Sequence, residues 1–544
     1  MKKINLFFLF ILFTSFLFAR EVKPVKNVIL MIPDGTSIGV YSAARWYKVY
    51  NNMGDALHID PYFTGTVSTF SSNAPIGDSA PTTSCYMTGI PSRSGYISTY
   101  PVHDPGNDLY PIDPTMAYQP LATILEASRI ENNKATGLVV TCEFPHATPA
   151  DCAAHHYNRG NYNALAPQIA YQNLDVMIGG GNEILTDDIK HHFQNNGTRL
   201  IQNDKNAMLN YNEENPLWAL FGDRALPYDL DRNPDTTPSL SEMTEKAIDI
   251  LSKKENGFFL MVEGSQVDWA AHGNDPVGII TEYLAFDEAV GKAIEFAKKD
   301  GETAVVILSD HGNSGMTIGK AECKGYDKLT LEQLFGEVSK YKNTASGIEQ
   351  KLIDVKPEDM KAEFKKHTNI DLTDDELKSL LSSKNYKEGN YMEITNSPNL
   401  THNIINIINS RMCFGFTTGG HTGEEVLLAA YHPDGDVPMG HLKNTDINDY
   451  LFKVSGLKTP LTKMTQRIFA KHHEVFDGLQ YTIEDKDADI PILVVRNKKN
   501  TLRVPAFSSV ASLNGKTFDL GSVTVYIDKN DTFYLPVNLA NKIK

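Results

Sequence analysis

Five short apolar runs, each ending at a polar or glycine-containing turn, restrict the possible folds of this chain more than any other feature. The runs lie at residues 27–32, 137–141, 175–178, 257–262 and 304–308. Helical patterns, such as those at 242–254 and 283–299, lie between them. Apolar runs of this length are typical of strands buried on both faces of a parallel sheet, with helices as crossover connections. The sequence therefore predicts an α/β fold with a large, mostly parallel central sheet flanked by helices on both faces.

The composition agrees with a large folded core and narrows the range of partners. The 544 residues are 41% hydrophobic and 22% charged, which excludes a disordered chain. With 51 Lys+Arg against 67 Asp+Glu, the formal net charge is −16. This charge, without a long basic run, argues against nucleic acid or an anionic membrane surface as the main partner. An anionic small molecule stays possible, because a bound cation can reverse the field inside one cleft.

The N-terminus predicts an exported protein. Lys2 and Lys3 precede an apolar stretch that runs from Ile4 to Ala19, and charge resumes at Arg20. We interpret residues 1–19 as a secretory signal peptide, since the stretch is shorter than the roughly 20 residues needed to span a bilayer. The alternative is an uncleaved membrane anchor. We expect a periplasmic or extracellular protein with no stable membrane association after cleavage.

The five cysteines form no metal or redox motif. They show no Cys-x-x-Cys spacing. Cys142 and Cys152 are close enough in sequence to form a disulfide, but buried thiols explain them equally well. The sequence leaves both alternatives open.

Two regions depart from the α/β pattern of the main domain, which we place at residues 20–484. Residues 322–400 are rich in Lys and Glu and contain a helix pattern at 372–381 with Thr373 as its cap, which predicts a helical surface insertion. Residues 485–544 contain short β runs separated by turns such as Asn514-Gly515, which predict a small C-terminal β module. Neither region identifies a ligand.

Polar side chains follow several predicted strands, where α/β sheets bind ligands. Asp34 follows the first run. In the segment Gly-Asp-Ser-Ala-Pro-Thr-Thr at 77–83, Asp78 can cap a helix and Pro81 suits its first turn. Ser79 would then lie at the positive end of that helix, where a nucleophile for an anionic substrate belongs.

Three further segments carry residue types that bind metals. Glu263 directly follows the fourth run, and Asp268 and His272 are spaced by four, so on a helix they share one face. Asp310 and His311 follow the fifth run, and His421 follows two glycines at 419–420. Mixed oxygen and nitrogen donors of this kind suit zinc. The set predicts a metal site at the carboxyl edge of the sheet.

Together these segments resemble the alkaline phosphatases. The matching elements are Asp34-Gly35, Asp-Ser-Ala at 78–80, His-Ala-Thr-Pro-Ala at 146–150 followed by Arg159, Val-Glu-Gly with Asp-x-x-x-His, Ser-Asp-His, and Gly-His-Thr-Gly at 420–423. They occur in the family's order over about residues 26–435, excluding the insertion. Six ordered elements make coincidence a poor explanation.

The resemblance implies two Zn²⁺ and one Mg²⁺ per chain. One zinc would be held by Asp268, His272 and His421, and the second by Asp34, Asp310 and His311. The magnesium would be held by Asp34, Thr148 and Glu263. Ser79 would form a phosphoserine intermediate from a small phosphate monoester, and Arg159 would bind the phosphate oxygens. The family resemblance also implies a homodimer.

Two positions differ from the enterobacterial pattern of the family. His146 stands where that pattern has Asp, and Trp269 stands where it has Lys. Both resemble animal and marine bacterial members and are expected to line the substrate site. They leave the zinc ligands intact, and they make magnesium a less secure choice for the third site.

Two other functions compete with a phosphomonoesterase. A superfamily neighbour could cleave phosphodiesters or sulfate esters, although a sulfatase needs Cys/Ser-x-Pro-x-Arg, and the segment that starts at Ser79 ends in Thr83. A catalytically silent surface-binding protein could keep the fold and use the β module for adhesion. The complete set of ligands and Ser79 argue against this second alternative.

Overall fold

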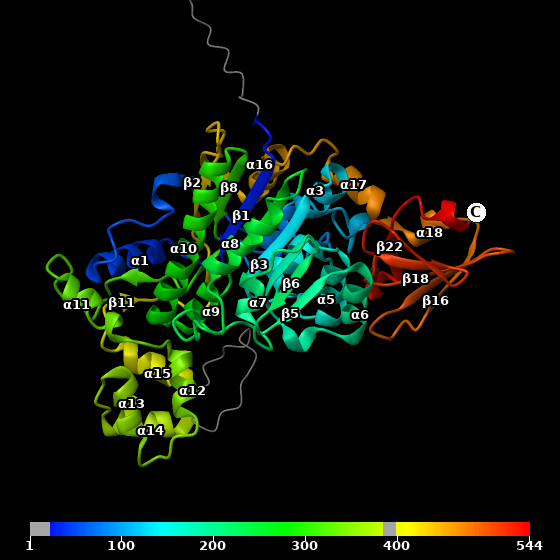
Figure 1. The fold of residues 1–544 in the computed structure, drawn as a ribbon. Coiled ribbons are helices and arrows are strands. Elements are labelled where there is room, and N and C mark those ends of the chain that lie inside the picture. The colour runs from blue at the N-terminus through cyan, green and yellow to red at the C-terminus, as the bar shows by residue number, and fades with distance from the viewer. Residues whose placement is uncertain (1–21, 384–398, 544) are drawn as a thin grey trace, which may run out of the picture.

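A ten-stranded sheet runs through the centre of the molecule (Figure 1). The computed structural model describes residues 22–383 and 399–543, so the expected signal peptide at 1–19 lies outside the described residues. The strand order is β14-β2-β13-β8-β1-β7-β3-β4-β6-β5. The strands are β1 (Asn27–Pro33), β2 (Phe63–Ser68), β3 (Ala135–Glu143), β4 (Val176–Gly180), β5 (Arg199–Gln202), β6 (Leu217–Leu220), β7 (Phe258–Gly264), β8 (Thr303–Leu308), β13 (Val426–Tyr431) and β14 (Gly440–Lys443).

The predicted parallel sheet is confirmed. All five apolar runs are strands of this sheet: β1, β3, β4, β7 and β8. Strand β13 is antiparallel to β2 and β8, and the other pairs of described strands in the sheet are parallel. Each residue of β1 is buried, with Ile29 and Met31 in the core on one face and Leu30 and Ile32 in the core on the other.

Helices cover both faces of the sheet, which accounts for the continuous apolar runs. One face packs against α1 (Ile38–Tyr50), α8 (Leu240–Leu251) and α10 (Pro276–Asp300). The other packs against α2 (Ser79–Thr88), α3 (Ile124–Asn132), α5 (Tyr162–Tyr171), α16 (Asn444–Val454) and α17 (Leu461–Ile468). Further helices outside the insertion are α4 (Ala147–Ala153), α6 (Asp187–Asn196), α7 (Lys205–Leu209), α9 (Gln266–Gly273), α18 (His472–Val475) and α19 (Ala540–Ile543).

The two helices expected at 242–254 and 283–299 are α8 and α10, and both begin earlier than expected. A capping box between Ser239 and Glu242 starts α8, and the Asp275 carboxylate caps α10 ahead of Pro276. In the described part of the chain, no helix combines the length and the apolar character needed to cross a membrane.

The expected insertion is helical. Its helices are α11 (Leu331–Phe335), α12 (Ala345–Leu352), α13 (Met360–Thr368), α14 (Asp374–Ser383) and α15 (Leu400–Asn409), and α12 to α15 gather at one end of the molecule (Figure 1). Thr373 and Glu376 form the predicted cap of α14. The helices pack around buried Leu352, Phe364 and Ile404. Helix α15 ends at Asn409, so the helical region continues past residue 400.

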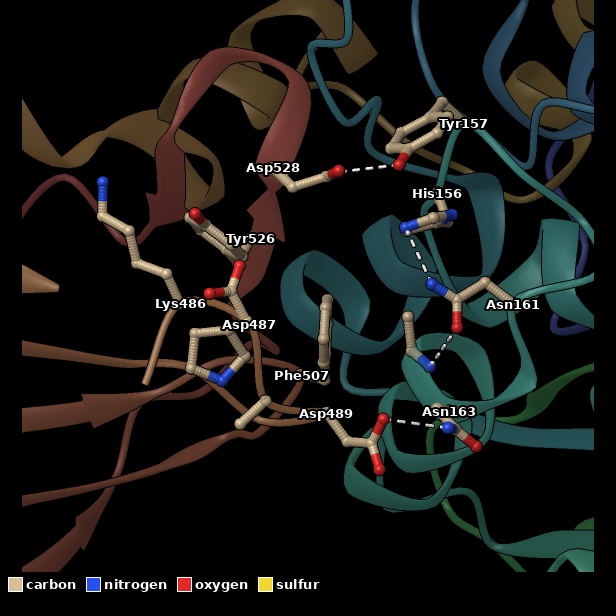
Figure 2. Close-up of a pocket in the computed structure, with 13 residues that line it drawn as sticks. His156, Tyr157, Asn161, Asn163, Lys486, Asp487, Asp489, Phe507, Tyr526 and Asp528 are labelled. Carbon is tan, nitrogen blue, oxygen red and sulfur yellow. Dashed lines mark hydrogen bonds between the residues drawn. The ribbon is translucent and has the colours of Figure 1, made fainter. Parts of the chain in front are cut away.

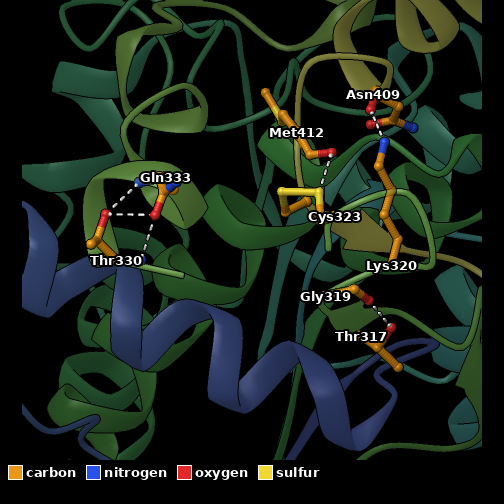
Figure 3. Close-up of a disulfide and its surroundings, with 9 residues drawn as sticks. Thr317, Gly319, Lys320, Cys323, Thr330, Gln333, Asn409 and Met412 are labelled. Atoms are coloured by element: carbon orange, nitrogen blue, oxygen red, sulfur yellow. Dashed lines mark hydrogen bonds between the residues drawn. A yellow bond between two sulfur atoms is a disulfide. The ribbon is translucent and has the colours of Figure 1, made fainter. Parts of the chain in front are cut away.

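A disulfide between Cys323 and Cys413 closes this helical region at its base (Figure 3). The adjoining strands β10 (Thr317–Ile318) and β11 (Phe414–Gly415) form a two-stranded ladder beside it. Cys142 and Cys152 are separate buried thiols, so of the two alternatives for that pair the thiols are correct. Sequence reasoning missed the real disulfide, because its cysteines are 90 residues apart and no local spacing connects them.

Removing this disulfide is expected to loosen the insertion. In the chain-entropy treatment, a crosslink that closes a loop of this length contributes about 4 to 5 kcal/mol at most. The double substitution Cys323→Ser with Cys413→Ser should lower the midpoint of thermal unfolding and expose the insertion to limited proteolysis. Cys85→Ser, which removes a buried free thiol, is the control. Unchanged melting and proteolysis of the double variant would contradict the prediction.

The C-terminal β module consists of two antiparallel sheets. A five-stranded sheet contains β16 (Gln480–Glu484), β17 (Ile492–Arg496), β18 (Thr501–Pro505), β19 (Val510–Leu513) and β20 (Lys516–Asp519). A three-stranded sheet contains β15 (Ala470–Lys471), β22 (Thr532–Leu535) and β21 (Val525–Ile527). Both sheets include strands that precede residue 485. Leu493, Leu502 and Phe533 are buried in the core of the module.

The module packs against the segment that follows α4. Tyr157 donates a hydrogen bond to Asp528 at 2.7 Å, and Asn163 donates one to Asp489 at 2.9 Å. A pocket of about 290 Å³ opens between these contacts (Figure 2). Its lining residues are not among the polar residues at the strand ends, so the pocket is separate from the candidate active site.

Candidate active site

The candidate site lies at the carboxyl ends of three neighbouring strands, β8, β1 and β7. Asp34 follows β1, Asp310 follows β8, and Glu263 is the last residue but one of β7. All three carboxylates are fully buried. Gly35 has a φ of +59°, and a Cβ at this position would lie 2.2 Å from Asp268 Oδ1. Glycine is therefore required beside Asp34, both for the backbone conformation and for the close approach.

Asp34, Asp310 and His311 form one buried group beside Ser79. His311 Nε2 lies 3.3 Å from Asp34 Oδ1 and 3.5 Å from Asp310 Oδ2. Ser79 Oγ lies 3.4 Å from Asp34 Oδ2 and 3.2 Å from His311 Nε2. Asp310 Oδ2 is buried without a hydrogen bond to the described residues. Two carboxylates and an imidazole at these separations fit a zinc ion.

Asp268, His272 and His421 form a second group. His272 Nε2 is 3.4 Å from Asp268 Oδ2, and His421 Nε2 is 3.1 Å from His272 Nε2 and 3.7 Å from Asp268 Oδ1. The first two residues share one face of α9. His421 reaches them because β12 (His421–Thr422) pairs with β9 (Gly312–Asn313), which directly follows His311.

Backbone carbonyls orient both histidines of this group. His272 Nδ1 contacts Gly419 O at 3.0 Å, and His421 Nδ1 contacts Gly77 O at 2.9 Å. These contacts place the proton on Nδ1 and leave the Nε2 lone pairs directed at each other. The His311 and His421 rings stack with centroids 3.7 Å apart, so the two groups are adjacent. Adjacent sites suit a pair of cations that act on one phosphate.

Glu263 and Thr148 lie at a third position. Thr148 is in the first turn of α4, and Thr148 Oγ1 and Glu263 Oε1 are both buried without a hydrogen bond inside the described structure. The Cys142 thiol donates to the other oxygen, Glu263 Oε2, at 3.5 Å. Donor atoms of Cys142, His146 and Glu263 all lie within 4.8 Å of one another. The sequence analysis missed Cys142, and its position four residues before His146 on the same segment was the available signal.

The three groups together place several carboxylates in the buried centre of the site, where their ionised forms are energetically unfavourable. Burial, followed by the neighbouring acids, raises the pKa of Asp34 well above its ordinary value. Burial raises the pKa of Glu263 to about 7. Burial also lowers the pKa of His421 to about 4, which leaves its imidazole neutral and able to bind a metal. Asp34, Glu263, Asp268 and Asp310 are buried, and the last three are close enough to act electrostatically on Asp34, so their charges need a compensating positive charge, which divalent cations would supply.

Arg159 faces this cluster from the segment after α4. It forms an ion pair with Asp78, and Arg159 Nη2 lies 3.4 Å from His146 Nε2. The ring centroids of His146 and Trp269 are 5.8 Å apart. The expectation that Asp78 caps α2 is wrong: Asp78 occupies the N-cap position, but its side chain makes no capping hydrogen bond. Its carboxylate instead orients the Arg159 guanidinium.

A family model described as alkaline phosphatase matches residues 25–457 of the chain. The chain belongs to the alkaline phosphatase family. Alkaline phosphatase 3 of Bacillus subtilis is 34% identical over 452 residues, which cover 79% of this chain and 88% of that protein. The alkaline phosphatase of Escherichia coli is 30% identical over 354 residues, covering 54% of this chain and 72% of that protein.

A solved structure agrees with this assignment. The cold-active alkaline phosphatase from a psychrophilic Shewanella has a TM-score of 0.67 and 26% identity, and the match covers 80% of this chain and all of that one. The family match ends at residue 457, so the C-terminal β module, whose first strand β15 begins at Ala470, lies beyond it.

Asn313 is a further site residue of this alkaline phosphatase that the sequence analysis missed. Its Nδ2 donates to Asp268 Oδ1 at 2.7 Å, and its backbone pairs with His421. It therefore positions two of the residues in the second group. Its place two residues after His311 was the only signal in the sequence.

A buried contact between Glu126 and His155 anchors the segment that carries Arg159. Glu126 accepts from Gln172 at 2.6 Å and contacts His155 Nε2 at 3.2 Å, with both ionisable side chains fully buried. Burial opposes ionisation, but His155 and the hydrogen bonds still hold the pKa of Glu126 below its ordinary value of 4.5. The native state therefore binds fewer protons here than the unfolded state.

Glu126→Gln is expected to destabilise the protein by about 1 to 3 kcal/mol at neutral pH, because it replaces a charged acceptor in a buried network. The stabilisation by Glu126 is present above pH 4.5 and is lost as the pH falls through its lower folded-state pKa. The difference in unfolding free energy between wild type and variant should therefore shrink below pH 4.5. Denaturant melts at pH 7.5 and at acidic pH measure this difference, and an equal difference at both would contradict the prediction.

Proposed function

We propose that this alkaline phosphatase hydrolyses phosphomonoesters through a phosphoserine on Ser79. The observation that carries the proposal is the place of Ser79 Oγ, 3.2 Å from His311 and 3.4 Å from Asp34 at the first residue of α2. We assign one zinc to Asp268, His272 and His421 and a second to Asp34, Asp310 and His311. A third cation is assigned to Asp34, Thr148 and Glu263, where the family resemblance suggests magnesium.

Each side chain of the site has a separate role in the proposed reaction. Arg159, held by Asp78, binds two non-bridging oxygens of the phosphate with its planar guanidinium. The N-terminus of α2 adds favourable partial charge next to the phosphate. Ser79 Oγ attacks phosphorus and forms the new P–O bond while the bond to the alcohol breaks and the alcohol leaves. The bound cations would lower the pKa of the Ser79 hydroxyl and stabilise charge on the entering and leaving oxygens. Water then cleaves the phosphoserine and releases phosphate.

We also propose that the protein is exported. The N-terminal segment supports this, as does the disulfide between Cys323 and Cys413, since structural disulfides persist in oxidising compartments. We assign catalysis to residues 20–484 and treat residues 485–544 as a separate module.

The test is a comparison of substrates with purified protein loaded with zinc and magnesium. Rates on an aryl phosphate, a diaryl phosphodiester and an aryl sulfate are measured at alkaline pH. We expect the highest kcat/KM on the monoester. A higher value on the diester or the sulfate would assign the site to a superfamily neighbour's reaction, and no turnover of any of the three would favour the catalytically silent alternative.

A further inference from the structure

Cys142 is a buried thiol that points at the third cation position. It lies near the end of β3, and its side chain is completely buried. Its Sγ is 3.5 Å from Glu263 Oε2, and His146 supplies a ring nitrogen within 4.8 Å of both groups. Thiol, imidazole and carboxylate donor atoms are therefore grouped at this position.

We propose that Cys142 is a thiolate ligand of the third cation and that it makes this site selective for zinc over magnesium. The inference rests on the proposed function, because it concerns the same buried centre. Cys142, His146 and Glu263 supply one sulfur, one nitrogen and one oxygen donor, and Thr148 offers a further oxygen.

The donor set and its spacing fit zinc. Zinc binds sulfur at about 2.3 Å and oxygen at about 2.0 Å, so tetrahedral coordination separates the two donors by about 3.5 Å. The Cys142 Sγ and Glu263 Oε2 atoms already have this separation. Magnesium prefers about six oxygen ligands in an octahedron, and a sulfur and a nitrogen replace oxygens here.

Unsatisfied polar atoms at the same position point independently to a ligand. Glu263 Oε1 and Thr148 Oγ1 are fully buried and make no hydrogen bond to the described part of the chain. A buried carboxylate oxygen without a partner is costly, so a cation at this position removes an energetic penalty. A thiol that only donated a weak hydrogen bond to Oε2 would leave both atoms unsatisfied.

The other free cysteines provide matched controls. Cys152 is buried, and its Sγ contacts the backbone carbonyl of Thr148 at 3.5 Å. Cys85 is buried within α2. Cys323 and Cys413 are joined to each other. Because all five cysteines lie in the described residues, a thiolate ligand must come from Cys85, Cys142 or Cys152.

The first experiment is a titration of the metal-free protein with Co²⁺, since a cobalt–thiolate bond gives a charge-transfer band in the near ultraviolet. We expect this band when the third equivalent of Co²⁺ binds to the wild type. It should also appear in a Cys85→Ser/Cys152→Ser variant, in which Cys142 is the only free thiol. Cys142→Ser, or Cys142→Ala if the serine variant does not fold, should lack the band. Binding of three cobalt ions without the band in the wild type would overturn the proposal, as would an undiminished band in a folded Cys142 variant.

The second experiment measures selectivity. Wild type and Cys142→Ser are dialysed against limiting zinc with excess magnesium, and the metal content is measured by mass spectrometry. We expect about three zinc ions per wild-type chain, and two zinc ions with one magnesium in the variant. Equal contents would overturn the claim of selectivity. Turnover of an aryl phosphate is recorded separately, so a loaded but inactive protein would refute the proposed function without deciding the role of Cys142.

Discussion

Ser79→Ala is expected to lower kcat on an aryl phosphate by about 10³-fold or more, because the nucleophile that forms the covalent intermediate is lost. Ser79 Oγ lies 3.4 Å from the Asp34 carboxylate and 3.2 Å from the His311 ring nitrogen Nε2. Acid quenching of the wild type with a ³²P-labelled monoester should leave label on the protein. The variant should carry none.

Ser128→Ala is the matched control for this substitution. Ser128 is a fully buried serine on α3 whose hydroxyl makes no hydrogen bond to the described residues, so its removal should leave kcat unchanged. Both variants should show the wild-type circular dichroism spectrum. A Ser79→Ala protein that kept more than about one per cent of the wild-type kcat would refute covalent catalysis by Ser79.

Removal of the divalent cations is expected to abolish activity and to lower stability. A cation bound only to the folded state at 1,000 times its Kd stabilises that state by about 4 kcal/mol, and each of the cations contributes in this way. Metal analysis should find zinc at both the site around Asp268 and the site around Asp310, in addition to the cation at the third site, and these zinc ions should be lost together with activity on chelation. Re-addition of zinc should restore both activity and melting temperature.

The contribution of Glu263 to the stability of the stripped protein should depend on pH in a defined direction. Burial raises the folded-state pKa of Glu263 from 4.5 to about 7, so this carboxyl binds more protons in the folded chain than in the unfolded chain between these values. Its contribution to stability should therefore fall as the pH rises from 4.5 to 7, and the raised pKa of Asp34 acts in the same direction. Burial lowers the pKa of His421 to about 4, which acts in the opposite direction, so the Glu263 contribution is measured as the difference in unfolding free energy between stripped wild type and stripped Glu263→Gln. The substitution should favour the folded state more at pH 8 than at pH 5. Full activity in protein shown to be free of metal would refute the metal-dependent mechanism.

The sequence predicted the elements whose signals are local. The runs at β1, β3, β4, β7 and β8 were recognisable because strands buried on both faces are continuously apolar. Placing Asp34, Glu263 and Asp310 at one edge followed from the rule that parallel strands end at the same edge. The spacing of four between Asp268 and His272 predicted a shared helix face. The roles of these residues stay proposals, because they come from family resemblance and geometry.

The tertiary structure alone decided the contacts between distant segments. The disulfide of Cys323 with Cys413, the ion pair of Asp78 with Arg159 and the approach of Cys142 to Glu263 each join residues on different elements. Periodicity and capping rules report only on the residues of one element, so they assigned Asp78 to a cap and gave Cys142 no part in a metal site. Its meeting with Glu263 depends on the packing of β3 beside β7, which aligns Val140 with Glu263 in the sheet. That alignment comes from the hydrogen bonds and core packing of the whole sheet, and no single segment encodes it.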